Sequence, residues 1–201
     1  RSSDLYILDT KYVAESLIKL IRFEENQLNN LLILYEERKK HHDVLYEDFR
    51  RKEFDPDDHF NEFQMMHAFN KQAEYQQRIL IPILDEINNI KDSIENKKHS
   101  ISALSGALLQ IAKQGISFVH NGIKNCPDGR QIRKDVLKNV IWQGRNQAMH
   151  FEEGNYNDFL ITCFNNIGYP TVPLRNLAKE VIDILGWTDY QKYEDDMKSL
   201  L

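Results

Sequence analysis

The sequence predicts an all-α protein, in which a long N-terminal antiparallel helical hairpin is followed by a bundle of shorter C-terminal helices. All eight glycines lie at or after Gly106, and the first hundred residues are rich in helix-favouring Leu, Ile, Glu, Lys and Gln. No segment alternates between apolar and polar residues as a half-buried strand would. We therefore expect one helical domain over 1–201, with the hairpin at 1–113 and the shorter helices at 114–201.

The first predicted helix runs from about Asp9 to Lys40 and can extend to Arg51. Its apolar residues recur at helical spacing, at Val13, Leu17, Leu20, Ile21, Leu28, Leu31, Leu32 and Tyr35. A turn is expected at 53–56, because Asp55 is a suitable N-cap and Pro56 suits the first position of a new helix.

The second predicted helix carries a longer apolar seam with alternating steps of three and four residues. The seam comprises Met66, Phe69, Ala73, Leu80, Ile83, Ile87, Ile90, Ile94, Ile101, Leu104, Leu108 and Ile111. This spacing favours coiled-coil-like packing against the first helix. Pro82 should kink the helix, and the seam keeps its register through the polar stretch 96–100, so we expect the helix to continue there.

The second half of the chain is divided by glycine and proline. Asn121-Gly122 and Pro127-Asp128-Gly129 bracket a loop. Four shorter helices are expected after it, at about 131–151, 156–167, 173–185 and 188–200. Gly154 and Gly186 should end the first and third of these, and Thr188 should cap the last.

The net charge of −5, with 28% charged residues, is ordinary for a soluble protein and does not indicate a wholly basic nucleic-acid binder. The charge is uneven, however. Between Asn121 and Arg145 there are six basic residues and two acidic ones. This segment is either a solvated helix face or a surface for RNA, for which the candidate binding residues are Arg130, Arg133, Lys134 and Lys138.

Cysteine usage and apolar runs predict a cytoplasmic protein. Cys126 and Cys163 form no C-x-x-C pair, which argues against a structural zinc site and favours a reducing compartment. No signal peptide is evident, and the longest apolar run, 79–84, is too short to span a membrane. Because the chain does not begin with methionine, we expect it to belong to a longer one.

The stretch 144–153 contains the residues with the clearest chemical potential. On a helix, Asn146 and His150 are four residues apart and share a face, and the long side chain of Arg145 can reach the same surface. Imidazole transfers protons near neutral pH, and a guanidinium binds phosphate and stabilises its charge. This combination suits a phosphodiester with a neighbouring hydroxyl group, as in RNA.

An arginine, a polar residue and a histidine after three further residues, in an all-helical domain, resemble the HEPN (higher eukaryotes and prokaryotes nucleotide-binding) superfamily of ribonuclease type. The flanking Trp142-Gln143-Gly144 and Phe151-Glu152-Glu153-Gly154 are similar to motif helices of stand-alone bacterial members. The resemblance implies a single HEPN-like domain over 1–201. It also implies a homodimer in which two motifs meet, and an activity that needs neither a metal nor another cofactor.

By this resemblance, the protein is a metal-independent endoribonuclease. His150 would act as general base on the 2′-hydroxyl or as acid on the leaving 5′-oxygen. Arg145 would hold the phosphate, and Asn146 would orient the histidine or the phosphate. The products would be a 2′,3′-cyclic phosphate and a 5′-hydroxyl, and the protein would act as a toxin or antiphage effector, with a possible antitoxin or activating partner.

Three observations keep alternatives open. HEPN toxins paired with nucleotidyltransferase antitoxins often carry a tyrosine two positions after the histidine, where this chain has Glu152. The long seam and the acidic net charge also suit a non-catalytic dimerisation or interaction module. Oxygen and nitrogen ligands at Asp57, Asp58, His59 and Glu62 could instead support a metal-dependent hydrolase, although acidic residues are expected in the first turn of any helix.

Overall fold

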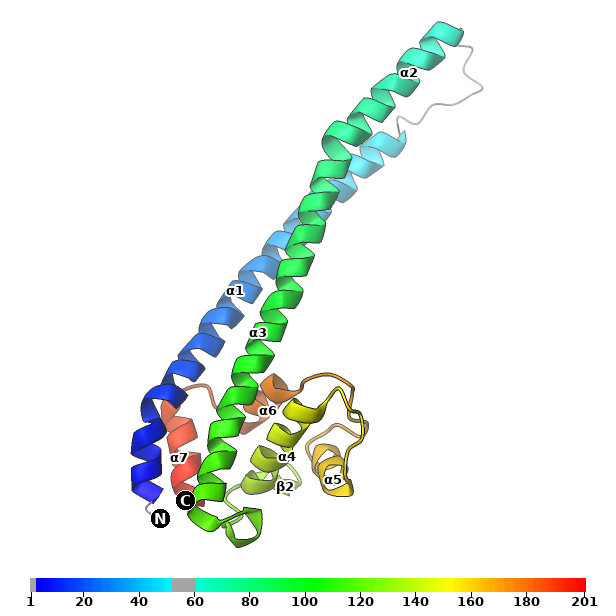
Figure 1. Ribbon diagram of the computed structural model, residues 1–201. Coiled ribbons are helices and arrows are strands. Elements are labelled where there is room, and N and C mark those ends of the chain that lie inside the picture. Colours follow the sequence, from blue (N-terminus) through cyan, green and yellow to red (C-terminus); the bar gives the residue numbers. More distant parts are fainter. Residues whose placement is uncertain (1–2, 52–60) are drawn as a thin grey trace. The chain divides into compact units, whose positions relative to one another are not determined.

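The computed structural model describes residues 3–51 and 61–201 (Figure 1). The predicted all-α class is confirmed. The helices are α1 (Ser3–Arg51), α2 (Glu62–Tyr75), α3 (Ile81–His120), α4 (Leu137–His150), α5 (Asp158–Asn166), α6 (Ala178–Leu185) and α7 (Tyr190–Leu200). The turn predicted at 53–56, with Asp55 and Pro56, lies outside the described residues. In the described ranges, no helix combines the length and the apolar character needed to cross a membrane.

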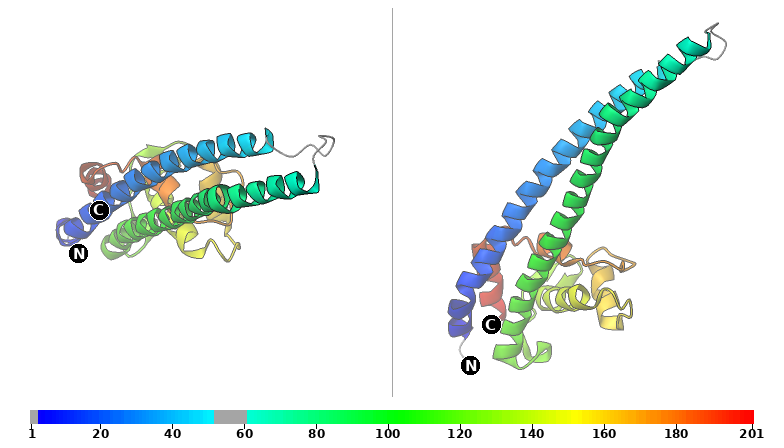
Figure 2. Two further views of the ribbon diagram at one scale, coloured as in Figure 1. Left: turned by 90° about the horizontal axis from the view of Figure 1, so that it is seen from above. Right: turned by 45° about the horizontal axis from the view of Figure 1, so that its top comes forward.

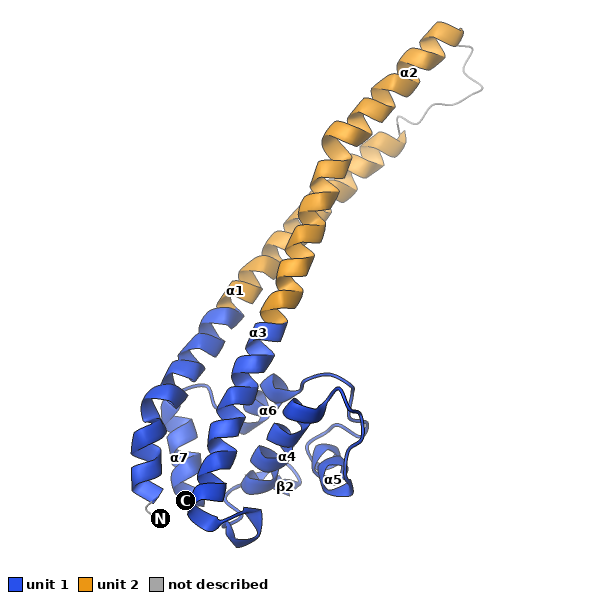
Figure 3. Cartoon of the chain, in the orientation of Figure 1, with its two compact units in different colours: residues 1–25, 99–201 blue, residues 26–98 orange. Residues whose placement is uncertain are grey.

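The chain forms two compact units (Figure 3). Unit 1 comprises residues 1–25 and 99–201, and unit 2 comprises residues 26–98. Both long helices, α1 and α3, therefore contribute to both units. The division expected at residue 113 therefore differs from the observed boundaries. The C-terminal part of α3, from His99 onward, belongs to unit 1 together with the shorter helices.

Unit 2 is an antiparallel helical hairpin, as predicted (Figure 2). Arg38 on α1 and Glu86 on α3 form an ion pair, with Nε and Oε1 3.1 Å apart. The rings of Phe49 and Tyr75 stack with their centroids 5.9 Å apart. Part of the predicted seam is buried here, at Leu80, Ile87, Ile90 and Ile94.

A π turn, Gln76–Leu80, joins α2 to α3. It ends two residues before Pro82, which has no N–H to donate and whose ring would clash with the carbonyl four residues earlier in a regular α-helix. Wider turns of this kind interrupt the usual hydrogen-bond ladder. The discontinuity predicted at Pro82 thus takes the form of a π turn, and α3 continues without a break through 96–100.

The seam prediction is wrong for α2. Met66 and Phe69 are 68% and 69% exposed, and α2 buries no residue completely. Its least exposed positions are instead Ala68, Gln72 and Tyr75. Ala68 and Gln72 lie one residue before the predicted seam positions Phe69 and Ala73, which is the shift that the extra residue of a π turn produces.

Unit 1 contains the principal core, to which α3, α4, α5, α6 and α7 all contribute buried side chains. Its largest completely enclosed side chains include Leu108, Leu109, Ile116, Leu137, Ile141, Phe164, Leu177, Leu185, Met197 and Leu200. At the N-terminal end of α1, Tyr6 donates a hydrogen bond to the carbonyl of Ile111 on α3, at 2.8 Å. Cys163 is buried.

The helix predicted at 131–151 begins only at Leu137. The preceding residues form two short antiparallel strands, β1 (Gln131–Ile132) and β2 (Asp135–Val136). Strands of two residues are too short to show an alternating pattern, which is why they were not predicted. The buried carboxylate of Asp135 fixes the hairpin, since it accepts hydrogen bonds from Asn139 on α4 and Asn166 on α5.

Other predicted helix starts also require correction. The segment from 173 remains non-helical until Ala178, because the buried side chain of Gln147 binds its backbone: the amide donates to the carbonyl of Arg175 and accepts from the N–H of Leu177. The cap of α7 is Asp189 rather than Thr188, and it accepts from the N–H of Lys192. Gly186 ends α6 in the left-handed conformation, as predicted.

Candidate active site

The position of α4 is set by the face that it buries. Gly144 packs so closely on α6 that a Cβ atom there would lie 2.7 Å from Cγ1 of Val181. Gln147 and Ala148, three and four residues further on, are buried on the same side. Arg145 and His150 therefore lie toward the outer side of the helix, where solvent reaches them.

At the C-terminal half of α4, Asn146 and His150 lie beside the same pocket, whereas Arg145 contacts Asn146 without lining that pocket. Nη1 of Arg145 lies 3.4 Å from Oδ1 of Asn146, and Asn146 in turn donates to Gln143. Asn146 and His150 line one open pocket of about 290 Å³, with Glu153, Asn155, Tyr156, Asn157 and Leu160 completing its wall. The imidazole is half-exposed, so a ligand in the pocket could reach it.

Glu153 orients the histidine, a role that was not predicted from the sequence. Its Oε1 lies 2.8 Å from Nδ1 of His150. In the neutral ring, this contact places the proton on Nδ1, which leaves Nε2 as the acceptor. The two residues meet because a turn follows the end of α4, in which the N–H of Glu153 donates to the carbonyl of His150.

Two residues of α3 also approach the motif, and neither was predicted. Gln110 accepts a hydrogen bond from Nε of Arg145. One turn later, the ammonium of Lys113 lies 4.5 Å from the centroid of the Trp142 ring. Burial lowers the pKa of Lys113, and the nearby positive charge of Arg145 lowers it further.

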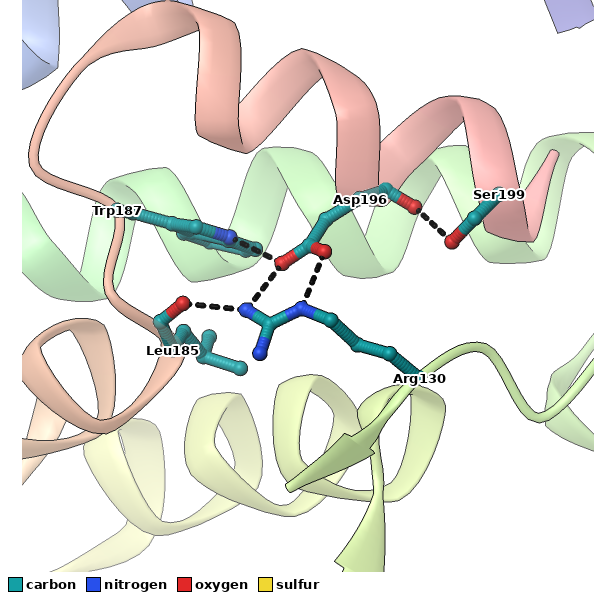
Figure 4. A network of polar contacts seen from close by, with 5 residues as sticks. All are labelled: Arg130, Leu185, Trp187, Asp196 and Ser199. Carbon is teal, nitrogen blue, oxygen red and sulfur yellow. Dashed lines mark hydrogen bonds and ion pairs between the residues drawn. The ribbon is translucent and has the colours of Figure 1, made fainter.

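Most of the candidate RNA-binding residues bind other parts of unit 1. Arg130 pairs with both carboxylate oxygens of Asp196, at 2.6 and 2.8 Å, and donates to the carbonyl of Leu185 (Figure 4). The hydrogen bond to Asp196 raises the pKa of Arg130. Trp187 donates to the same carboxylate. Arg130 therefore stabilises the position of α7.

Arg133 and Lys138 also bind other residues of unit 1. Arg133 has a φ of +53° in the β1–β2 turn and donates to the carbonyl of Ile167. Lys138 pairs with Asp128 at 2.7 Å and donates to the carbonyl of Cys126. Of the four candidates, Lys134 alone is exposed without a hydrogen bond or ion pair in the described part of the chain.

Metal ligands do not gather in the described residues. No group of three or more His, Cys, Asp or Glu side chains is arranged there to hold an ion. Asp57, Asp58 and His59 of the alternative metal site lie outside the described ranges, and only Glu62 is described.

Comparisons of the chain with family models, with curated proteins and with solved structures found no match. The motif and its surroundings are thus the basis for a functional proposal.

Proposed function

We propose that this protein is a metal-independent endoribonuclease that acts in the cytoplasm as a toxin or antiphage defence effector. The observation that carries the proposal is the pocket shared by Asn146 and His150, with Arg145 in contact with Asn146. The resemblance of the Arg-Asn-x3-His motif to that of HEPN ribonucleases implies the same chemistry.

In this proposal, Nε2 of His150 takes the proton of the RNA 2′-hydroxyl, or gives a proton to the leaving 5′-oxygen. Attack of the 2′-oxygen on phosphorus breaks the bond to the 5′-oxygen and leaves a 2′,3′-cyclic phosphate. Arg145 stabilises the charge that develops on the phosphate oxygens. Asn146 holds the guanidinium and shapes the pocket floor.

We further propose a homodimer with the motif at its interface. One motif supplies one imidazole, while strand cleavage benefits from both an acid and a base. Met149 and Phe159 support this arrangement, since they adjoin the pocket residues His150 and Leu160 and are 56% and 81% exposed. Exposed apolar side chains beside a site are typical of protein interfaces. Phe159→Glu should therefore yield monomers in sedimentation velocity and reduce cleavage.

The test is cleavage of total bacterial RNA by the purified chain in EDTA. Wild type should give discrete fragments with cyclic-phosphate ends, and His150→Ala and Arg145→Ala should give none. Matched controls are His67→Ala and Arg78→Ala, which alter exposed residues of unit 2. Equal cleavage by all variants, or loss of wild-type cleavage in EDTA, would contradict the proposal.

The alternative function is a non-catalytic helical dimerisation or interaction module of a defence or toxin–antitoxin system. It is favoured by α2, which exposes Phe63, Met66 and Phe69 to 81%, 68% and 69%. Intact RNA in every lane, together with capture of an antitoxin-like partner that Met66→Glu releases, would favour this function over the ribonuclease.

A further inference from the structure

A second cation lies beside the motif, on the neighbouring helix. Gln110 and Lys113 are one turn apart on α3, and Trp142 and Arg145 are one turn apart on α4. Gln110 accepts from Arg145, and Lys113 lies over the ring of Trp142. The ammonium of Lys113 and the guanidinium of Arg145 therefore flank one small surface of unit 1.

Among the residues that the structure describes, these two cations lack an acidic partner. Within residues 3–51 and 61–201, no carboxylate oxygen lies within 4 Å of either one, whereas Arg130 and Lys138 each pair with an aspartate. Lys113 and Arg145 are both partly buried. Like charges brought together away from water repel each other, and a bound anion would remove that repulsion.

Both groups retain donors for an anion. Arg145 uses Nε for Gln110 and Nη1 for Asn146, and Nη2 has no acceptor among the residues described. Lys113 has three N–H donors, and its contact with the Trp142 ring is electrostatic and leaves them available. A phosphate oxygen is the anionic acceptor that Arg and Lys commonly bind.

We propose that Lys113 and Arg145 together bind one phosphodiester group of the RNA, with Trp142 holding the Lys113 ammonium in place. This inference rests on the proposed ribonuclease function and extends it by adding a phosphate-binding residue on α3. The site needs no metal ion, because the protein itself supplies two positive charges to the phosphate.

Binding can be measured separately from cleavage with a 2′-O-methylated RNA 12-mer, which lacks the attacking hydroxyl. We would measure its fluorescence anisotropy with the full chain at several sodium chloride concentrations. Lys113→Met should weaken binding about tenfold and reduce the slope of log K against log salt by about one. Lys113→Arg should keep most of the affinity, and Lys91→Met, which alters an exposed lysine on the same helix, should match wild type.

The outcomes separate this inference from the proposed function. Wild-type affinity and salt slope in both Lys113→Met and Lys113→Gln would overturn the inference, and so would a wild-type chain that does not bind the 12-mer. If the chain in either case still cleaves unmodified RNA, the proposed ribonuclease function is retained although the phosphate site is not. Conversely, Lys113-dependent binding without cleavage of unmodified RNA would overturn the ribonuclease and support the phosphate site. A merely structural role for Lys113 would lower the melting temperature and leave the salt slope unchanged.

Discussion

His150 and Glu153 form an exposed pair in which Nδ1 of the imidazole lies 2.8 Å from Oε1 of the carboxylate. Exposed pairs of this kind contribute up to about 1 kcal/mol, or roughly a factor of five. If the pair orients His150 for proton transfer, Glu153→Ala should lower the single-turnover cleavage rate by up to about fivefold. Glu153→Gln, which keeps an acceptor oxygen, should lower it less. A loss as large as that of His150→Ala would instead mean that Glu153 contacts the substrate.

Arg130 should prove to be a stabilising residue and not an RNA ligand. Two side chains, Arg130 and Trp187, donate to the buried carboxylate of Asp196. Arg130→Ala would leave this carboxylate with the Trp187 N–H alone. We expect the free energy of unfolding to fall by about 2–4 kcal/mol in urea titrations. Lys134→Ala, an exposed control, should change it by no more than about 0.5 kcal/mol. If Arg130→Ala were as stable as wild type but bound RNA more weakly, Arg130 would be an RNA-binding residue after all.

Gly144 should be required for the contact between α4 and α6. Gly144→Ala would place its Cβ 2.7 Å from Val181, and such overpacking costs about 1–3 kcal/mol, offset in part by a helix-propensity gain of about 1 kcal/mol. We expect a net loss of up to about 2 kcal/mol in the free energy of unfolding. Val181→Ala should make the Gly144→Ala change less costly, as a double-mutant cycle would measure. Additive effects would show that the two positions do not clash.

A cluster of tyrosines should make unit 1 sensitive to alkali. Burial raises the pKa of Tyr6 and of Tyr190 to about 12, and raises that of Tyr193 further. Above about pH 10 the unfolded chain loses these protons while the folded chain keeps them. Stability should therefore fall as the pH rises from about 10 to about 12.

Tyr6→Phe tests this cause. The variant loses the hydrogen bond to Ile111, so it should be less stable than wild type near pH 8 by about 1 kcal/mol. Its urea midpoint should then fall less steeply above pH 10. Parallel pH profiles for the two proteins would exclude Tyr6 as a source of the alkaline sensitivity.

The long helices were predictable because glycine is absent before Gly106 and the apolar residues keep a helical period. Helix starts were less predictable. The onset of α6 depends on Gln147, some 30 positions away from the backbone that it binds. The β1–β2 hairpin depends on Asp135 reaching α4 and α5. Contacts of this kind leave no local pattern in the sequence.

The candidate site was only partly predictable for the same reason. Asn146 and His150 are four residues apart on one face of a helix, and Arg145 adjoins Asn146 in the sequence. Lys113 and Gln110 belong to another helix, and their approach to Arg145 depends on how α3 packs against α4. Conversely, Arg130, Arg133 and Lys138 were grouped by charge alone, and charge does not reveal which cations are already paired.

The π turn at Gln76–Leu80 determines which side chains of α2 face away from solvent. The turn holds one residue more than a regular helix would, so deleting one residue there should leave a regular helix with Ala68, Gln72 and Tyr75 still on the least exposed face. If the same residues wound as a regular α-helix with none deleted, every side chain of α2 would rotate by about 100° about the helix axis, and Phe69 and Ala73 would take the places of Ala68 and Gln72. An unusual helical geometry thus keeps an apolar stripe in water that a regular helix would turn toward α1. The loss of one residue in this turn should therefore be tolerated, because both faces of α2 stay as they are.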